Sequence, residues 1–471
     1  MVTMLAPLPW AQRQFGDADL RDQRRTRRAV AYAAAAAAGP SRSVPRQCDG
    51  RWKQTKGAYR LFDQAEVTLD RLQEPHRRLT LQEASGRQAV LWISDTTTLS
   101  FDHPATEGLG VTSTGGRGQG MLLHSTLAVD VSGGIEASPF VLGLGHQQVW
   151  ARRGKKNKGR PESEKWAAGV QALQVPPPNA RWVHVADAES DCWEAIETCV
   201  RRGVGFAVRA CQDRQVIAGH GSSDDLSSAT TMFELLRQQP AMGNKKLWVR
   251  SRPGRAADWA MLAVSALAIT LLPPKNWSDK PHRKSKPRPE PMTCWALRIH
   301  QINAPRGQEP IEWIILTDEP LDRLEAALKV SFWYSCRWLI EEYHKCLKTG
   351  CRMEQRQLEE ADRLKALLGI LAVVAVRLLQ LKHQARMNPT EAASQIVPTN
   401  YLRTLAAYLK QSPEKMTTRQ FWIETARLGG FLGRKGDGDP GWLTLWLGWQ
   451  HLETLATGFE LAKESKGKCV Q

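Results

Sequence analysis

One stretch of the chain, residues 331–349, places charged and aromatic side chains together at helical spacing. On a helix that turns 100° per residue, six of these side chains fall within an arc of about 100°. The six are Tyr334, Arg337, Trp338, Glu341, Lys345 and Lys348. Because Leu339, Ile340 and Tyr343 fall on the opposite side, we expect the helix to pack through that side and to present the charged side to a ligand.

The presented face combines one carboxylate with two lysines, an arginine, a phenol and an indole. Cations bind phosphate groups and aromatic rings stack on nucleobases, so this combination favours contact with a nucleic acid. A solvated helix also places Glu and Lys four residues apart, as Glu341 and Lys345 are, so charge alone leaves a solvent-exposed ion-pair face as an alternative. The rings of Tyr334 and Trp338 at the centre of the face argue against that alternative.

The whole chain carries the charge that such a partner requires. Its 471 residues include 65 Lys and Arg against 48 Asp and Glu, and the resulting net charge of +17 indicates a polyanionic partner. This length predicts about two to four domains. A hydrophobic content of 42% excludes wholesale disorder.

Cysteine usage and hydropathy indicate a cytoplasmic protein that does not contact a membrane. The nine cysteines are odd in number and include no C-x-x-C pair, unlike a disulfide framework or a zinc ribbon, which favours a reducing compartment. The longest apolar run, 366–376, is followed by Arg377 and falls short of the roughly 20 residues that a membrane helix needs. We therefore expect no membrane span.

Helical regions are expected at both ends of the chain. Residues 1–70 carry two groups of basic and aromatic side chains, which suit phosphate contact and groove insertion, with a solvated charged face as the alternative. The members singled out are Arg24, Arg25, Arg27, Arg28, Tyr59 and Arg60. Residues 371–471 are rich in Leu and Trp, and Trp442, Trp446 and Trp449 fit either an internal core or a partner surface.

Residues 71–370 are expected to form a mixed α/β sheet with helices packed on it. In the first of its strands, 89–93 leads to a strand end at Asp95, and a later strand, 181–186, ends at Asp187. Both acids would therefore lie at strand ends.

The alternation of strands and helices stops between residues 212 and 310, where strand-like segments predict an inserted β subdomain. Within it, the Pro-, Lys- and Arg-rich segment 273–291 is expected to be an exposed basic loop. The strand that contains Trp313 would then rejoin the main sheet.

The spacing of Tyr334, Arg337, Glu341 and Lys348 reproduces a Y-(2)-R-(3)-E-(6)-K signature, and the chain resembles the DDE transposases of the insertion-sequence-four group. Further stretches that resemble this family are Trp10-Ala11 with Phe15-Gly16, Asp22 with 24–28, 57–60, Asp95-Thr96-Thr97, 337–345 and 441–446. These motifs occur in order over nearly the whole chain, so the resemblance rests on more than one spacing.

The resemblance implies a ribonuclease H-like catalytic core, interrupted by the β insertion and flanked by an N-terminal DNA-binding domain and a C-terminal dimerisation domain. It also implies that Asp95, Asp187 and Glu341 are the catalytic metal ligands. Phosphoryl transfer on DNA uses two divalent cations about 3.5–4 Å apart, and carboxylates suit Mg²⁺, with Mn²⁺ as the expected substitute. An aspartate after a strand is, taken alone, also a common turn or N-cap residue.

Matching positions imply the DNA contacts. Tyr334, Arg337, Lys345 and Lys348 would grip phosphates near the transposon end. Trp313 would receive a flipped base, unless it is a core tryptophan of a buried strand. One departure is that Ala188 follows the second aspartate where the family has an arginine, from which we expect at most a modest effect.

The activity implied is cut-and-paste transposition. The protein would bind terminal inverted repeats as a homodimer in a synaptic complex, nick each end, form and open a hairpin, and join the 3′-hydroxyl to target DNA. One alternative is a DNA-binding regulator that inhibits transposition without cleaving. Another is a sequence-independent nuclease, which the basic N-terminal region disfavours.

Overall fold

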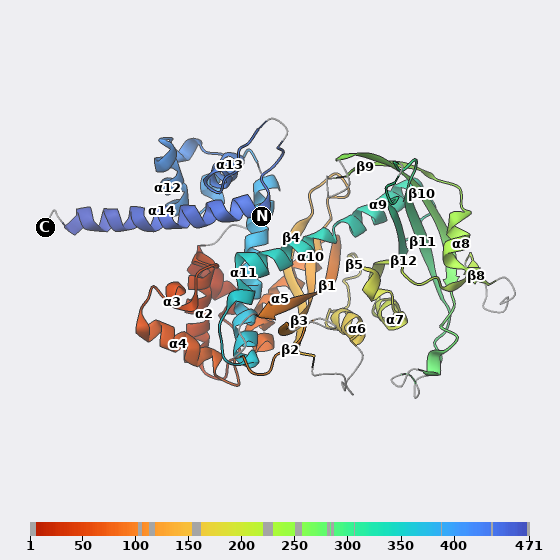
Figure 1. The fold of residues 1–471 in the computed structure, drawn as a ribbon, viewed down its shortest axis with the longest axis horizontal. Coiled ribbons are helices and arrows are strands. Elements are labelled where there is room, and N and C mark those ends of the chain that lie inside the picture. The colour runs from red at the N-terminus through yellow and green to blue at the C-terminus, as the bar shows by residue number, and fades with distance from the viewer. Residues whose placement is uncertain are drawn as a thin grey trace.

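The computed structural model describes residues 6–468 except 102–105, 113–117, 153–161, 220–228, 250–256, 280–282, 284–286, 306, 388 and 435–436. A long mixed sheet forms the middle of the molecule, and helices from both ends of the chain gather at one end of that sheet (Figure 1). The expected mixed α/β architecture with helical ends is therefore confirmed.

Five helices precede the sheet. They are α1 (Pro7–Phe15), α2 (Gln23–Ala38), α3 (Val44–Gln47), α4 (Trp52–Phe62) and α5 (Leu69–Ser85). Asp22 caps α2 by accepting a hydrogen bond from the Arg24 amide, and the alanine-rich side of α2 is buried. Helices α2 and α4 pack so closely that a Cβ at Gly57 would lie 1.6 Å from an Arg28 guanidinium nitrogen. The N-terminal region is thus one packed helical unit.

The strands that matter most for function are neighbours in the sheet. They are β4 (Phe140–Trp150), β3 (Gln119–Asp130), β1 (Ala89–Phe101), β5 (Arg181–Ala186) and β6 (Gly205–Arg209), with the two-residue β2 (Gly110–Val111) beside β3. Strand β3 runs antiparallel to its neighbours β4 and β1, whereas β1, β5 and β6 run parallel.

Strand β1 corrects one expectation, because it does not end at Asp95. It continues to Phe101, since β3 pairs with it along its whole length from Val90 to Phe101. Strand β5 does stop at Ala186, whose partner on β1 is Ser94. Asp95 and Asp187 are therefore the next residues on two adjacent parallel strands.

The insertion extends this same sheet. Its strands are β7 (Gln215–Ala218), β8 (Thr230–Thr231), β9 (Gly243–Val249), β10 (Asp258–Leu271) and β11 (Met292–Gln301), with helix α8 (Met232–Arg237). Strand β12 (Glu312–Thr317) pairs with β11 on one side and β6 on the other. The predicted β insertion is present, but its hydrogen bonds continue those of the main sheet.

The segment 273–291 is exposed at Lys275, Arg288 and Glu290, as expected, but it is anchored to the fold at two residues. Where the structure describes it, Trp277 and Arg283 are buried. Arg283 pairs with Glu194 at 2.5 Å and lies 4.2 Å from the centroid of the Trp277 ring. Because Glu194 belongs to helix α7 (Trp193–Arg202), this ion pair fastens the segment to the main fold.

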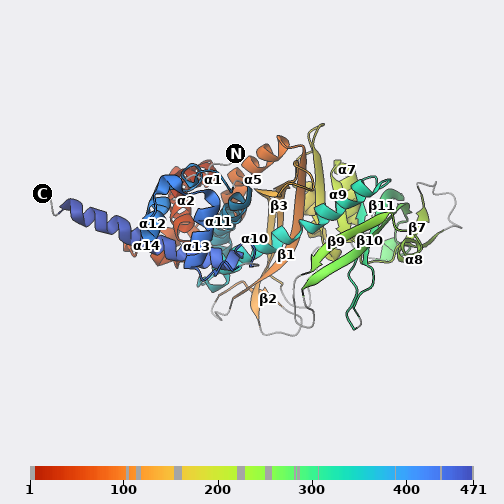
Figure 2. The same cartoon turned by 90° about the horizontal axis from the view of Figure 1, so that it is seen from above.

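Helices cover both faces of the sheet. In addition to α7, they include α6 (Glu164–Gln171), α9 (Leu324–Ser335), α10 (Trp338–Lys345) and α11 (Ala361–Met387). Helices α9 and α10 follow each other across one face, as seen from two directions (Figures 1 and 2). Leu91 and Ile93 of β1 belong to the hydrophobic core on that side, whereas Val90 and Trp92 belong to the core on the other.

The C-terminal region is built on α11, α12 (Thr399–Leu409), α13 (Thr418–Leu428) and α14 (Trp442–Lys468). The segment Ala361–Leu381 of α11 is long and apolar enough to cross a membrane, but 83% of that window is buried inside the protein, as in a core helix. Trp446 and Trp449 are also buried, and Trp449 stacks on Trp422 at 5.7 Å. These two tryptophans therefore belong to the core.

Candidate active site

The two aspartates lie side by side but are held differently. Asp95 faces α10, because it alternates with Leu91 and Ile93 along β1, and its carboxylate accepts a hydrogen bond from the Thr96 amide at 2.7 Å. Asp187 caps a 3₁₀ turn and accepts the Glu189 amide at 3.0 Å. Both carboxylates can thus reach one region beside the sheet.

Burial shapes the acidity of both groups. It raises the pKa of Asp95 to about 6, and the nearby charges of Asp187 and Glu341 act in the same direction, against the Thr96 amide and Arg337. Burial also raises the pKa of Asp187, against the effects of Arg337 and Lys165. These effects place both Asp187 and Glu341 within electrostatic range of Asp95.

The helix that carries Glu341 is interrupted, which corrects the prediction of one continuous helix over 331–349. Helix α9 ends at Ser335, α10 begins at Trp338, and a π-helical turn follows at Cys346–Gly350. At the break, the Arg337 amide bonds to the Tyr334 carbonyl three residues back instead of four. The predicted apolar side of this segment is buried, as expected.

Arg337 lies at this break and bridges two of the acids. Its guanidinium Nη2 is 2.5 Å from Glu341 Oε1, and its Nη1 is 3.9 Å from Asp95 Oδ2. The arginine side chain is 23% exposed and that of Glu341 is 44% exposed. Glu341 is thus paired with a cation of its own helix turn.

His344 also lies against Asp95, a contact that sequence reasoning missed. Its Nδ1 is 4.0 Å from Asp95 Oδ2, and burial lowers the pKa of the imidazole to about 3. Its position on the helical wheel, about 20° from Arg337, is the signal that would have found it.

The carboxylates do not form a closed metal site in this structure. In the described part of the chain, no group of three or more His, Cys, Asp or Glu side chains is gathered so that it could hold a metal ion. Carboxylate oxygens are the donors that Mg²⁺ prefers, so the chemistry of the three acids fits. Their arrangement does not, because Arg337 holds Glu341.

A lysine on helix α6 completes the Asp187 side of the site. Lys165 is only 8% exposed, its Nζ lies 3.2 Å from Glu189 Oε2, and the amine is 5.2 Å from the centroid of the Trp166 ring. Asp191, three residues after the turn begins, is instead structural, because its buried carboxylate accepts the Cys211 and Gln212 amides. Nothing in the local sequence marks Lys165, since one Lys in a helix is ordinary.

The predicted DNA-contacting residues of this region are only partly exposed. Tyr334 is 7% exposed, its ring lies 6.1 Å from that of the half-buried Trp313, and it interacts with Arg209 at the end of β6. Trp338 is 38% exposed. The prediction that Tyr334 projects from an open face is therefore wrong, because β12 and the end of β6 cover it. Arg209 is a further cation that the sequence did not reveal.

The two predicted lysines lie further along the same segment. Lys345 is exposed on α10. Lys348, in the π-helical turn, is half-buried, and its Nζ lies 3.6 Å from Glu354 Oε1. The signature lysine, Lys348, is thus partly engaged by an acid, whereas the exposed Lys345 has its side chain on the surface.

The predicted N-terminal residues divide between structure and surface. Arg25 donates hydrogen bonds to the Leu20 carbonyl and to Gln64, so it helps to hold the helices together. Arg24, Arg27, Arg28, Tyr59 and Arg60 are exposed, as is Trp52 of α4, which is 71% exposed. A basic and aromatic surface therefore exists on α2 and α4.

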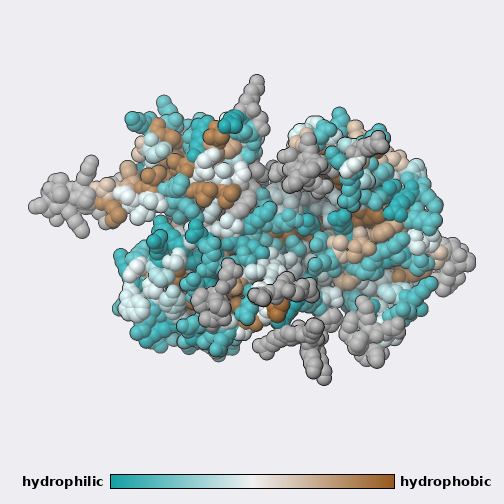
Figure 3. Space-filling view, in the orientation of Figure 1, coloured by the Kyte–Doolittle hydropathy of each residue, from teal (hydrophilic) through white to brown (hydrophobic). Residues whose placement is uncertain are grey.

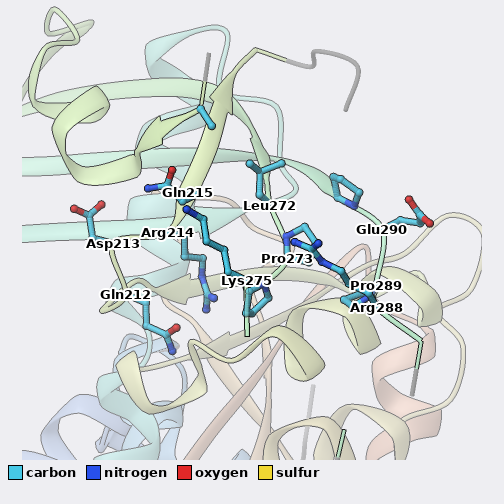
Figure 4. Close-up of a pocket in the computed structure, with 13 residues that line it drawn as sticks. Gln212, Asp213, Arg214, Gln215, Leu272, Pro273, Lys275, Arg288, Pro289 and Glu290 are labelled. Atoms are coloured by element: carbon cyan, nitrogen blue, oxygen red, sulfur yellow. The ribbon is translucent and has the colours of Figure 1, made fainter. Parts of the chain in front are cut away.

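A cavity of about 790 Å³ lies in the insertion, between β7 and the segment after β10 (Figure 4). Arg214 points down from its wall beside Gln212, but it is paired with the buried Asp191. Lys275 and Arg288 share the cavity with Asp213 and Glu290. These two cations and two anions balance, so the lining favours neither an anionic nor a cationic ligand.

The C-terminal helices carry apolar residues on the surface, visible as brown areas over this end of the molecule (Figure 3). On α14, Leu443 is 48% exposed, Leu447 is 39% exposed and Leu461 is 61% exposed. Apolar side chains exposed in a row along a helix are typical of a surface that contacts another protein.

Comparisons with known proteins match both ends of the chain. Residues 8–67 match a family model described as transposase DNA-binding, and residues 373–467 match one described as the transposase Tn5 dimerisation domain. The matched regions coincide with the basic surface on α2 and α4 and with the apolar surface on α14.

One similar solved structure is a synaptic complex of piggyBac transposase with hairpin DNA. It has a TM-score of 0.33 and 10% sequence identity over 76% of this chain, and the match spans 56% of that solved chain. No conclusion follows from a likeness of this size. The two matched regions carry the identification: the chain's resemblance to the insertion-sequence-four transposases, and within them to transposon-five transposase, is confirmed.

Proposed function

We propose that this protein is a cut-and-paste DNA transposase that cleaves transposon ends and joins their 3′-hydroxyls to target DNA. The observation that carries this proposal is the position of Asp95 and Asp187 at the same level of adjacent parallel strands, with Arg337 close to both Asp95 and Glu341. The strand order β4-β3-β1-β5-β6, antiparallel and then parallel, supports a ribonuclease H-like core.

The domains proposed are an N-terminal DNA-binding domain at 1–70, a catalytic domain at 71–370 and a C-terminal dimerisation domain at 371–471. The transposase DNA-binding match to 8–67 and the dimerisation match to 373–467 support the two outer ones. Terminal inverted repeats would bind α2 and α4, and a homodimer would hold two ends in one synaptic complex in the bacterial cytoplasm.

Asp95, Asp187 and Glu341 are the residues that would hold two Mg²⁺ ions, or Mn²⁺ in their place. Such ions, when bound, activate the attacking oxygen and stabilise the leaving one. The protein itself supplies position and charge: Arg337 and Lys345 would bind backbone phosphates beside the scissile bond. The nucleophiles are water and then a 3′-hydroxyl, so no covalent protein intermediate is needed.

Aromatic residues would serve the hairpin step. Formation of a hairpin at a duplex end requires one nucleotide to leave the base stack, at a cost of a few kcal/mol. The half-buried Trp313, beside Tyr334, and the more exposed Trp338 lie on the α9–α10 side of the site and offer rings that could stack on that base.

A second candidate function is a regulator that binds transposon ends without cleaving them. One observation favours it: the carboxylates in the described residues do not form a closed metal site. The presence of all three acids near one another favours the enzyme.

A denaturing-gel assay separates these functions. A labelled duplex that carries the inverted repeats flanking the gene is incubated with Mg²⁺ and either wild type or Glu341→Ala. The enzyme predicts a hairpin-sized product from wild type alone, and Asp95→Ala and Asp187→Ala should likewise bind the duplex without cutting it. Specific binding with no product, in Mn²⁺ as well, would favour the regulator. A ladder of products on any DNA would indicate a sequence-independent nuclease.

A further inference from the structure

Arg337 occupies the place where a metal ion would join two of the three acids. Its guanidinium contacts Glu341 Oε1 at 2.5 Å and approaches Asp95 Oδ2 at 3.9 Å. A guanidinium and a divalent cation cannot both lie between the same carboxylates, because their positive charges repel at short range. Arg337 and a divalent cation would therefore compete for Asp95 and Glu341.

The Arg337–Glu341 pair differs from an ordinary pair on a solvated helix. Exposed pairs four residues apart contribute only about 0.3–0.5 kcal/mol, so such a pair is easily exchanged. Here the arginine is only 23% exposed, and the second acid it approaches, Asp95, is 18% exposed. The guanidinium thus offsets the negative charge of both Asp95 and Glu341.

A phosphate is the natural competitor for this guanidinium. Arginine presents planar, paired N–H donors that bind carboxylates and phosphates in the same two-pronged way, and it stays charged at all relevant pH values. Arg209, which interacts with Tyr334, and the exposed Lys345 would add to the attraction for a DNA strand. A strand that enters the site would meet Arg337 already oriented by a carboxylate.

We propose that Arg337 couples DNA binding to metal binding. In the DNA-free protein its guanidinium holds Glu341 and shields Asp95. When a backbone phosphate takes the guanidinium, the two carboxylates are released to bind a divalent cation. This inference rests on the proposed function, because it assumes that DNA enters at this site. It explains why the three acids are near one another without forming a closed metal site.

The coupling has a measurable consequence in both directions. If a bound duplex raises the affinity for a metal ion by some factor, the metal ion raises the affinity for the duplex by the same factor. Factors of about 5–150 are typical of such coupling. Removal of Arg337 should raise metal affinity in the absence of DNA and should abolish the further gain that DNA provides.

The test measures Mn²⁺ binding by the full-length protein, followed by electron paramagnetic resonance, with and without a saturating pre-cleaved duplex. Wild type is compared with Arg337→Met and Arg337→Gln, two variants of similar side-chain length. Lys329→Met is the matched control, because Lys329 also pairs with a glutamate, Glu319, but on helix α9 outside the site. Thermal melting verifies that each variant is folded.

We expect Mn²⁺ to bind Arg337→Met and Arg337→Gln about tenfold more tightly than wild type without DNA. The duplex should tighten Mn²⁺ binding to wild type and to Lys329→Met, but not to the two Arg337 variants. An unchanged Mn²⁺ affinity in both folded Arg337 variants would overturn the coupling. Since wild type would still yield the hairpin product on the gel, that outcome would leave the proposed function intact. Absence of cleavage by wild type would instead count against the function alone.

Discussion

The two aspartates of the candidate site lie on neighbouring strands, yet the protein holds them by different means. Asp95 lies inside a long strand that is paired beyond it, so its carboxylate is 18% exposed and packed beneath α10. Asp187 ends a strand and caps its own turn through the Glu189 amide. Both carboxylates accept one backbone amide and both are partly desolvated, but Asp95 also faces the charges of Asp187 and Glu341, whereas Asp187 has Arg337 and Lys165 nearby.

The cations that accompany the two acids differ in the same way. Arg337 pairs with Glu341 and approaches Asp95, so both sides of that interaction belong to the site. Lys165 is buried, but its partner Glu189 is 68% exposed. Around Asp95, two carboxylates share one guanidinium. Beside Asp187, the cation Lys165 is paired with a different carboxylate, that of Glu189. The predictions below test that difference.

The largest effect is expected from Asp95→Asn, which should abolish cleavage and yet stabilise the fold at pH 7.5. The pKa of Asp95 is raised from 3.8 to about 6, so the folded state favours its protonated form. That contribution is complete below about pH 4 and is lost as the pH rises through 6, so ionised Asp95 destabilises the protein at neutral pH. Removal of the charge should recover about 1–3 kcal/mol.

Thermal melting at pH 7.5 and pH 5 measures this gain, which should shrink at the lower pH. Asp187→Asn is the comparison. It should also abolish cleavage, but its stabilisation should be smaller, because both Arg337 and Lys165 favour the charged form of Asp187. Equal stabilisation by the two variants, at both pH values, would contradict the difference between the two sides.

A smaller effect is expected from Lys165→Met, which removes the charge beside Asp187 and keeps most of the apolar bulk between Trp150 and Trp166. Residues that orient a metal-binding group typically change activity by 10–100-fold, so we expect cleavage to slow by about tenfold. The Mg²⁺ concentration required for half-maximal cleavage should rise with it. Lys165→Arg should recover much of the rate, whereas a purely space-filling role would be served better by Met.

How far the site could be predicted depended on the kind of information that each residue carries. The strand 181–186 and the position of Asp187 directly after it were predicted correctly, since an apolar run followed by a turn is visible in sequence. Strand β1 was predicted too short, because its second half is stabilised by pairing with β3, which no local pattern encodes. The mixed α/β sheet followed from the order of strands and helices.

The helix at 331–349 shows the same limit. Its buried side was predicted from periodicity. The break at Arg337 was not, because it depends on the backbone hydrogen bond from the Arg337 amide to the Tyr334 carbonyl, which no residue type in this segment indicates. Tyr334 was placed on an open face because β12 and Arg209, which cover it, are distant in sequence. Lys165 was missed for the same reason: its neighbours on β4 and beside β5 meet it only in the fold.

A weaker effect is expected from Tyr343→Phe, which removes a buried hydrogen bond between helix α10 and strand β4. The buried Tyr343 hydroxyl accepts a hydrogen bond from Gln147 Nε2 at 3.0 Å, and the same nitrogen donates to Ser125 Oγ at 2.8 Å. Loss of one such bond should destabilise the fold by about 1 kcal/mol, because Gln147 keeps its other partner. Melting measures this change, and a loss as small as that of an exposed Tyr408→Phe control would contradict it.

The smallest effect is expected from Ala188→Arg, which adds a cation next to Asp187. Ala188 is half-buried at the start of the 3₁₀ turn, where its carbonyl accepts a weak hydrogen bond from the Cys211 thiol at 3.2 Å. Since Lys165 already supplies a positive charge on this side, the new arginine should change the cleavage rate of wild type by no more than about threefold. In the Lys165→Met background the same substitution should restore part of the lost rate. Gel assays of the four combinations measure this: rescue in the double variant would establish that charge beside Asp187 is what Lys165 provides, and equal effects in both backgrounds would show that the two cations act independently.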